Sequence, residues 1–293
     1  MSRDGTNHYF ISPDPKAPRL TRTVDGVDET GASQKLSVVE ERPLTIFLNR
    51  QEIVTAMTIG DYPEYLALGF LRNQGMLSAG EAIKGVDYDD ELETVVVRTD
   101  ATTVYEEKLQ KKTRTSGCAV GTVFGDMMEG LDKVSLPDAP VRTSWLYALA
   151  AEINQTPSLY LEAGAIHGTV LCQEDRPLVY MEDVGRHNAV DKIAGWMLSE
   201  GVSGHDKLLY TTGRLTSEMV IKCAHMGVPV LASRSGFTAW GVDIARQVGL
   251  TVIGRMRGQR FTCLSGQHRL IRDVDPAHVR AEDRKHRRKG AEV

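Results

Sequence analysis

The chain has 293 residues, which is enough for roughly two domains of ordinary size. Apolar residues make up 41% of it and charged residues 25%, and both are values typical of globular proteins. The net charge of -4 argues against a dedicated nucleic-acid-binding protein, so we predict no DNA partner. The N-terminus lacks an apolar segment and no run of about 18 apolar residues occurs, so we expect neither secretion nor membrane insertion.

Residues 1–40 are polar and contain three prolines between positions 13 and 18, so we predict a flexible N-terminal tail. Regular structure is then expected as strands over 44–48 and 53–57, a helix from an Asp61 N-cap to about 74, and strands over 83–88 and 93–98. These elements predict a small α+β domain over 41–112. No catalytic or ligand-binding pattern occurs in it, so we expect a structural or partner-facing role.

A loop rich in small residues follows, with the sequence Arg-Thr-Ser-Gly-Cys-Ala-Val-Gly-Thr over 114–122. We assign residues 113–142 to this loop and a connector. Cys118 is its only thiol, and Lys111, Lys112 and Arg114 precede it. Nearby positive charge favours the reactive thiolate form of a cysteine. Composition alone nevertheless favours an inert free thiol, because most free cysteines serve only in packing.

Residues 143–270 show a regular alternation of strands and helices. We expect a helix over 145–153 capped by Ser144, then a hairpin of strands over 166–172 and 178–181. Three units of strand, loop and helix follow, and further strands are expected over 250–254 and 261–264. Successive units of this kind predict parallel strands in an α/β layered domain. The charged residues 271–293 are interpreted as a solvated C-terminal tail.

Arginine residues occur in the loops that follow the predicted parallel strands. Arg186, Arg214 and Arg234 lie in the three strand-to-helix loops, and a basic segment over 255–260 follows the last strand of the series. Loops of this type meet at one edge of an α/β sheet, where ligands bind. Helix N-termini and arginine side chains both bind phosphate. The pattern therefore predicts an anionic ligand, with phosphate groups as the first choice.

Three other polar residues in this region allow more than one interpretation. His187 lacks a Cys or His partner at metal-ligand spacing, so a hydrogen-bonding or phosphate-contacting role is preferred to metal binding. Glu182 and Asp183 could form an acid–base pair, or they could fix Arg186 or the Gly185 turn by hydrogen bonds. The sequence favours the structural role. The spacing of the four cysteines shows no metal site, and it fits free thiols in the reducing cytoplasm.

Several motifs together resemble the FdhD family of formate dehydrogenase accessory sulfurtransferases. They comprise Thr-Ser-Gly-Cys at 115–118, Met-Glu-Asp-Val-Gly-Arg-His-Asn-Ala-Val-Asp-Lys at 181–192 and the Arg-Gly segment at 255–260. The stretches 61–71 and 213–220 are similar as well. The resemblance extends from residue 41 to about 270. It implies a larger domain with the cytidine deaminase fold beside a smaller α+β N-terminal domain.

The resemblance also implies a function. Such a protein accepts persulfide sulfur from a cysteine desulfurase. It transfers this sulfur to Mo-bis(molybdopterin guanine dinucleotide) before or during insertion of the cofactor into formate dehydrogenase. Cys118 matches the cysteine that carries the persulfide. Six residues match the cofactor-binding segment, and three more are expected to contact the cofactor: Arg255, Met256, Arg257, Gly258, Gln259 and Arg260, with Arg186, His187 and Arg214.

The sequence departs from the family pattern at position 121, where Gly121 stands in place of a second loop cysteine. A disulfide between neighbouring loop thiols is therefore excluded, and a single-thiol route remains. Two alternatives are kept: a non-catalytic chaperone for the cofactor, and a zinc deaminase. The deaminase is disfavoured because the required glutamate and two zinc-binding cysteines are missing from the matching positions. A homodimer is compatible with the sequence, although no sequence feature establishes one.

Overall fold

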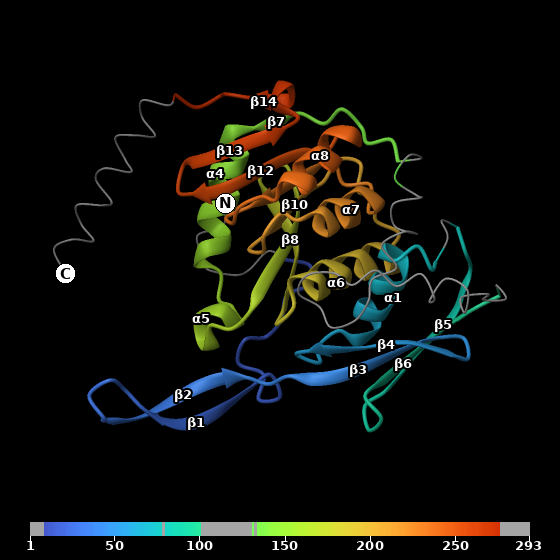
Figure 1. Cartoon of the computed structure of the whole chain (residues 1–293), viewed down its shortest axis with the longest axis vertical. Coiled ribbons are helices and arrows are strands. Elements are labelled where there is room, and N and C mark those ends of the chain that lie inside the picture. The colour runs from blue at the N-terminus through green and yellow to red at the C-terminus, as the bar shows by residue number, and fades with distance from the viewer. Residues whose placement is uncertain (1–8, 78–79, 101–130, 132–133, 276–293) are drawn as a thin grey trace.

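The computed structural model describes residues 9–77, 80–100, 131 and 134–275. In this part of the chain the strands form a six-stranded sheet, a four-stranded sheet and two two-stranded sheets. Figure 1 shows the helices packed around the six-stranded sheet, with the four-stranded sheet at one end of the molecule. None of the described helices is long and apolar enough to span a membrane. The protein therefore has a mixed α/β fold with several sheets.

The two-stranded sheet nearest the N-terminus corrects the prediction of a flexible tail over 1–40. Strands β1 (Thr21–Val27) and β2 (Ser33–Val39) pair in antiparallel register. The Asp28 carboxylate stabilises the connecting turn by accepting hydrogen bonds from the backbone amides of Thr30 and Ala32 at 2.9 and 3.0 Å. Most of the hairpin side chains are exposed. The prediction failed because an exposed hairpin lacks the apolar alternation by which half-buried strands are recognised.

The four-stranded sheet and its helix confirm the elements predicted between 44 and 98. The strand order is β4 (Gln51–Thr58), β3 (Arg42–Leu48), β6 (Thr94–Thr99) and β5 (Ile83–Asp89), with β3 and β6 parallel. Helix α1 (Pro63–Asn73) packs its apolar side chains on this sheet. The Asp61 N-cap was wrong: Tyr62 occupies that position with φ of 47°, and Asp61 is buried in an ion pair with Lys192.

The six-stranded sheet has the order β13-β12-β11-β10-β8-β9. Its strands are β8 (His167–Gln173), β9 (Arg176–Asp183), β10 (Leu208–Thr211), β11 (Val230–Ser233), β12 (Thr251–Arg257) and β13 (Arg260–Ser265). Strands β10, β11 and β12 are parallel neighbours, as predicted. Strand β8 lies between β9 and β10 and is antiparallel to both, so the sheet is mixed. The predicted hairpin of β8 and β9 is present, and its first strand, β8, separates β9 from the parallel strands β10, β11 and β12.

Helices cover both faces of this sheet. On one face, α6 (Arg186–Ser199), α7 (Ser217–His225) and α8 (Ala239–Gln247) bury their apolar side chains against residues such as Leu209 and Leu231. On the other face, α4 (Thr143–Gln155) packs on residues such as Leu208 and Tyr210. Successive strand residues point to opposite faces, so a continuous apolar strand supplies both cores. The short helix α5 (Leu159–Ala163), which was not predicted, precedes β8.

The C-terminal residues of the described chain cap helix α4. Strand β14 (Leu270–Ile271) pairs in parallel with β7 (Val141–Arg142), directly before this helix. The Asp273 carboxylate then accepts hydrogen bonds from the Ser144 amide at 3.0 Å and the Ser144 hydroxyl at 2.7 Å. These bonds lower the pKa of Asp273 below the ordinary aspartate value. The expected Ser144 N-cap was therefore wrong, because a distant carboxylate supplies the cap and Ser144 lies inside the helix.

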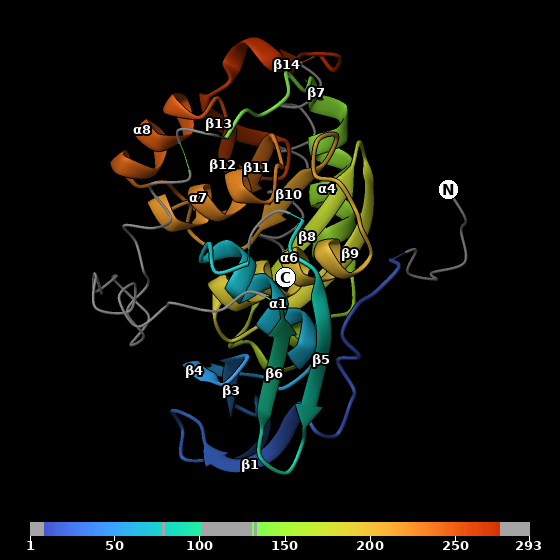
Figure 2. The same cartoon turned by 90° about the vertical axis from the view of Figure 1, so that its right-hand side faces the viewer.

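Helix α1 is held between the small sheet and α6, as Figures 1 and 2 show. Glycine makes this close crossing possible. A Cβ atom added to Gly69 would lie 1.7 Å from the Asp191 carbonyl oxygen, and one added to Gly195 would lie 1.9 Å from the Tyr65 carbonyl oxygen. Neither carbonyl can move without moving its helix. The two helices therefore touch backbone to backbone. The boundary predicted between residues 41–112 and 143–270 stays a prediction.

Candidate functional site: an arginine-lined sheet edge

The strands that precede the arginine loops all point in one direction. Because β8 is antiparallel to both β9 and β10, these two strands run the same way, and β11 and β12 run parallel to β10. The chain leaves all four strands at one edge of the sheet. Arg186 follows β9, Arg214 follows β10, Arg234 follows β11, and Arg255 lies within the last part of β12. The expectation that these residues share one sheet edge is confirmed.

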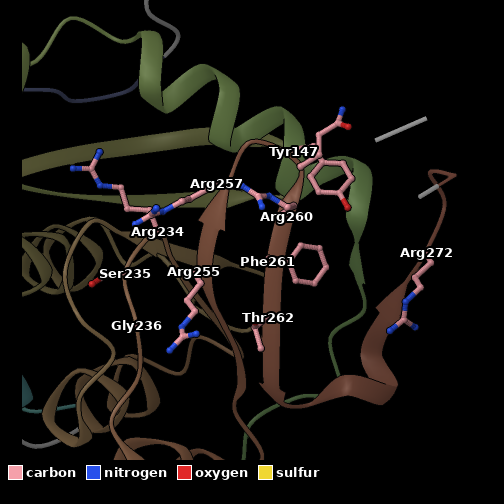
Figure 3. A pocket seen from close by; sticks show the side chains of 11 residues that line it. Tyr147, Arg234, Ser235, Gly236, Arg255, Arg257, Arg260, Phe261, Thr262 and Arg272 are labelled. Atoms are coloured by element: carbon pink, nitrogen blue, oxygen red, sulfur yellow. The ribbon is translucent and has the colours of Figure 1, made fainter. Parts of the chain in front are cut away.

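A pocket of about 910 Å³ opens where β11, β12, β13 and α4 meet. Figure 3 shows its side chains, with Tyr147 on α4 facing Phe261 on β13. Five arginines line the pocket, and the remaining lining residues are polar, aromatic or glycine. The full lining is Tyr147, Arg234, Ser235, Gly236, Arg255, Arg257, Gln259, Arg260, Phe261, Thr262 and Arg272. No acidic side chain belongs to this lining, so the pocket favours an anion.

The predicted segment over 255–260 forms the turn between β12 and β13. Arg255 has φ of 55°, a left-handed conformation that residues other than glycine seldom adopt, and the strand register shifts between Gly254 and Arg257. The Arg255 amide is held by the Ser235 carbonyl oxygen at 2.7 Å. Gly258 has φ of 56°, which suits the tight turn. This backbone directs Arg255, Arg257 and Arg260 to the pocket lining.

The six residues of this segment do not all meet the pocket. Arg255, Arg257, Gln259 and Arg260 line it, whereas Met256 is 4% exposed and packs in the core beside α4. Sequence position alone could not separate them, because the bulge in β12 decides which side chains turn outward. Met256 thus anchors β12 in the core and does not line the pocket.

Two aromatic residues and one arginine of the pocket were missed by sequence reasoning. The rings of Tyr147 and Phe261 lie 6.2 Å apart between centroids, tilted by 45°. Arg272 was assigned to the solvated tail but also lines the pocket. Tyr147 comes from a helix that is distant in the sequence from Phe261 and Arg272. No local pattern marks them, since only the β14–β7 pairing and the packing of α4 bring them together.

Arg186, His187 and Arg214 do not belong to the lining of this pocket. Arg186 is the first residue of α6, and a Cβ atom added to Gly213 would lie 2.9 Å from its Cβ. The side chain of Arg186 therefore packs on the loop that carries Arg214. Both residues form a second basic cluster at the same sheet edge, next to the pocket.

His167 and Arg234 connect this second cluster with the pocket. Burial lowers the pKa of His167, and the positive charges of Arg186, Arg234 and Arg214 lower it further. Arg234 is thus close enough to influence His167 while it also lines the pocket. Its guanidinium lies 4.9 Å from the ring centroid of Tyr160, in cation–π geometry. Arg234 therefore belongs to the pocket and also adds positive charge near His167, together with Arg186 and Arg214.

His187 is buried and contacts helix α7. It is 8% exposed, and its Nε2 atom lies 3.1 Å from a carboxylate oxygen of Glu218 on α7. Burial lowers the pKa of His187, and the hydrogen bond to Glu218 opposes that effect. The expected hydrogen-bonding role is therefore the one the structure supports, with a carboxylate as partner in place of a phosphate.

Cys118 lies outside the described residues, so the geometry of the expected nucleophile stays a prediction. Of the three cysteines that the structure describes, Cys172 and Cys223 are buried, and Cys263 is partly buried. Burial raises the pKa of each thiol. These three are poor thiolate nucleophiles. In the described ranges, no group of three or more His, Cys, Asp and Glu side chains is arranged to hold a metal ion.

The fold and this edge define a class of protein: a mixed α/β protein with an arginine-lined pocket that is bordered by aromatic rings and whose charge favours an anion. Comparison with known families identifies the group within that class. The model of the FdhD/NarQ family matches residues 39–271, and the chain belongs to this family.

Individual relatives agree with this assignment. The sulfur carrier protein FdhD of Listeria monocytogenes is 30% identical over 248 residues, which cover 83% of this chain and 95% of the relative. The sulfur carrier protein FdhD of Bacillus subtilis is 30% identical over 239 residues, covering 80% and 90% of the two chains. A crystal structure of a candidate formate dehydrogenase accessory protein from Desulfotalea psychrophila matches with a TM-score of 0.69 at 27% identity. It covers 86% of this chain and 98% of that one.

Proposed function

We propose that this protein is a sulfur carrier that serves formate dehydrogenase. In this proposal Cys118 accepts sulfur from the persulfide of a cysteine desulfurase. The protein then transfers the sulfur to Mo-bis(molybdopterin guanine dinucleotide) before or during insertion of that cofactor into formate dehydrogenase. The names of the relatives support the role of sulfur carrier. The observation that carries the proposal is the arginine-lined pocket, because an anionic nucleotide cofactor needs such a surface.

The pocket fits the chemistry of a guanine dinucleotide, which is a substrate in this proposal. Arg255, Arg257 and Arg260 can pair with pyrophosphate oxygens through two parallel hydrogen bonds each. The facing rings of Tyr147 and Phe261 offer a surface on which a base can stack. Arg186 and Arg214 extend the positive surface toward the rest of the ligand. His187 joins helix α6 to α7 through its contact with Glu218, and so stabilises the start of α6.

The sulfur transfer requires only one thiol on the protein. The Cys118 thiolate attacks the outer sulfur of the desulfurase persulfide. That sulfur–sulfur bond breaks, a new one forms at Cys118, and the desulfurase cysteine leaves as a thiolate. In the second step the sulfur–sulfur bond at Cys118 would break and Cys118 would leave as a thiolate. The cofactor would take up the outer sulfur, and the two electrons that reduce this sulfur to sulfide would come from the reduced cofactor or from an added thiol. Gly121 stands where a second loop thiol would be, so the persulfide stays on Cys118 until that transfer.

Intact mass spectrometry tests the nucleophile directly. The protein is incubated with a cysteine desulfurase and cysteine, and its mass is compared with that of the Cys118→Ala variant treated identically. We expect wild type to gain the mass of one sulfur atom, removable by a reducing agent, and the variant to gain nothing. Cys263→Ala is the matched control, since Cys263 is partly buried, and this variant should still gain the sulfur. An unmodified wild type, or an equally modified Cys118→Ala, would refute the role of Cys118.

A cofactor chaperone without sulfur chemistry is the second candidate, and the same arginine pocket favours it. It predicts that Cys118→Ala still activates formate dehydrogenase, whereas sulfur transfer predicts that activation is abolished. Activation of formate dehydrogenase in cells that carry only the variant separates the two. A zinc deaminase is disfavoured, because Arg214 and Leu215 occupy a loop where that chemistry needs cysteine ligands.

The remaining parts of the proposal concern fold and setting. We infer that the six-stranded sheet with its helices is layered as in cytidine deaminases. Its order β13-β12-β11-β10-β8-β9 and helices on both faces support this inference. The proposed partners are a cysteine desulfurase, the catalytic subunit of formate dehydrogenase and the guanine dinucleotide cofactor. A cytoplasmic setting follows from those partners, and a homodimer is part of the proposal as well.

A further inference from the structure

The end of strand β4, in the four-stranded sheet, contacts the edge of the six-stranded sheet from which the arginine loops leave. The hydroxyl of Thr58, the last residue of β4, donates a hydrogen bond of 2.5 Å to the Asp183 carboxylate at the end of β9. The backbone carbonyl of Met57 accepts a hydrogen bond of 2.8 Å from the side chain of Asn188 in α6. Thr58 is 1% exposed and Asp183 is fully buried. The contact between Thr58 and Asp183 is therefore shielded from water, whereas the contact between Met57 and Asn188 lies at the surface.

Asp183 in turn fixes the turn that begins helix α6. One of its carboxylate oxygens accepts hydrogen bonds from the Gly185 amide at 3.1 Å and from the Asn188 side chain at 2.9 Å. The other oxygen, which receives the Thr58 hydroxyl, also lies 2.7 Å from the Lys192 ammonium. The Asp183 carboxylate thus joins Thr58 of β4 to the Gly185 turn and to Asn188 and Lys192 of α6.

Arg186 follows Gly185 directly and packs on Gly213, beside Arg214. A change in the Gly185 turn would therefore move Arg186 and the start of α6 relative to the neighbouring loop. Thr58 does not belong to the arginine edge and cannot contact a ligand there, because it is buried beneath the turn. It can act on a ligand only through Asp183.

We propose that Thr58 is a positioning residue of the anion site: by fixing Asp183 and the Gly185 turn, it holds Arg186 in the orientation that binds the anionic ligand. This inference rests on the proposed function, in which Arg186 contacts the guanine dinucleotide. In this proposal the four-stranded sheet has a role in ligand binding. Thr58, the last residue of its strand β4, supports the residues that hold Arg186 and does not itself contact the ligand.

The experiment measures binding of guanosine diphosphate, one nucleotide arm of the proposed ligand, by isothermal titration calorimetry. Thr58→Val removes the hydroxyl and keeps the shape, whereas Thr58→Ser keeps the hydroxyl. Asn73→Leu is the control for stability, because it removes the 2.7 Å bond between α1 and Asp191 in the same helix α6, away from the Gly185 turn. All titrations are made at a temperature where each variant is shown to be folded.

We expect Thr58→Val to weaken binding of guanosine diphosphate by about tenfold, the cost of one misplaced charge-assisted hydrogen bond. Thr58→Ser should restore most of the affinity, and Asn73→Leu should bind like wild type. In an Arg186→Ala background, Thr58→Val should cause no further loss, because its effect passes through Arg186.

Each contrary result is informative. If wild type does not bind guanosine diphosphate, the proposed cofactor pocket fails and the positioning role fails with it. If wild type binds and Thr58→Val binds equally well, or weakens no more than Asn73→Leu, the positioning role is refuted while the pocket stands. An undiminished effect of Thr58→Val on the Arg186→Ala background would also refute it.

Discussion

Replacing Lys192 with methionine should show how strongly the buried charges bind the small sheet and α1 to α6. The ammonium of Lys192 is fully buried and lies 2.7 Å from Asp183. It also pairs with Asp61 and donates to the Glu182 carbonyl oxygen at 3.0 Å. Burial opposes the charge on Lys192, but the two carboxylates outweigh it and raise the pKa of the lysine. Methionine fills a similar volume and leaves both carboxylates without their cation.

The expected cost follows from that loss. Removing one partner of a buried ion pair costs about 3–5 kcal/mol, because a charge is left buried and uncompensated. Asp183 keeps its bonds to Thr58, Gly185 and Asn188, which limits the penalty on that side. Asp61 has an oxygen without a hydrogen-bond partner among the described residues even in wild type. Lys192→Met should therefore lose about 4 kcal/mol of unfolding free energy at pH 7.

The loss should depend on pH in a defined direction. Burial already raises the pKa of Asp61, and Lys192 opposes that rise. Without Lys192 the pKa of Asp61 in the folded protein rises further above its unfolded value of about 4. Protonation then favours the folded variant, so the deficit should be full above the folded pKa and should shrink as the pH falls toward the unfolded value.

Urea unfolding at pH 7 and pH 5, followed by circular dichroism, measures both effects. Lys222→Met is the matched control: Lys222 is buried 2.6 Å from Asp191, so this variant leaves one carboxylate without its cation, and Asn73 still donates to it. We expect it to cost less than Lys192→Met. A deficit for Lys192→Met below about 1 kcal/mol at pH 7, the value of an exposed pair, would refute the reasoning. A deficit identical at both pH values would refute the assignment to Asp61.

Two further predictions concern the helix crossing and the pocket. Gly195→Ala should lower the free energy of unfolding, measured by urea denaturation, by about 3 kcal/mol or more, since its Cβ would lie 1.9 Å from the Tyr65 carbonyl oxygen. Gly201→Ala is the control: it has open space around its Cβ and should show only the smaller strain of its positive φ. Arg257→Ala should weaken guanosine diphosphate binding about tenfold and reduce its salt dependence in calorimetry. Arg142→Ala, outside the pocket lining, should not, and equal effects would contradict the pocket.

Local sequence patterns predicted most of the elements of the two larger sheets and their helices. Apolar strands such as 44–48 and 250–254 are short, bounded by turn residues and separated by helices with an apolar face. The two N-caps at Asp61 and Ser144 were wrong because tertiary contacts took over the roles of these residues. The exposed hairpin β1–β2 was missed because it buries too little to show a pattern.

The candidate site was predicted in part for a similar reason. Arg186, Arg214 and Arg234 follow strands, so their common edge could be inferred from the direction of the strands alone. The sequence also led to the preference for a structural role of Asp183, which the hydrogen bonds to the Gly185 turn confirm. It could not divide the arginines between the pocket and the neighbouring cluster. That division depends on the bulge in β12 and on which loops lie next to each other.

The sequence by itself determined the family, the series of strands and helices, the arginine-bearing edge and the single thiol of the loop at Cys118. These are properties of local composition and spacing, which the chain carries before it folds. Only the tertiary structure decided that Tyr147 faces Phe261, that Arg272 joins the pocket and that Thr58 supports the Gly185 turn. Each of these contacts joins segments far apart in the chain. They form because packing buries the helices on the sheets, and no local pattern encodes which distant side chains then meet.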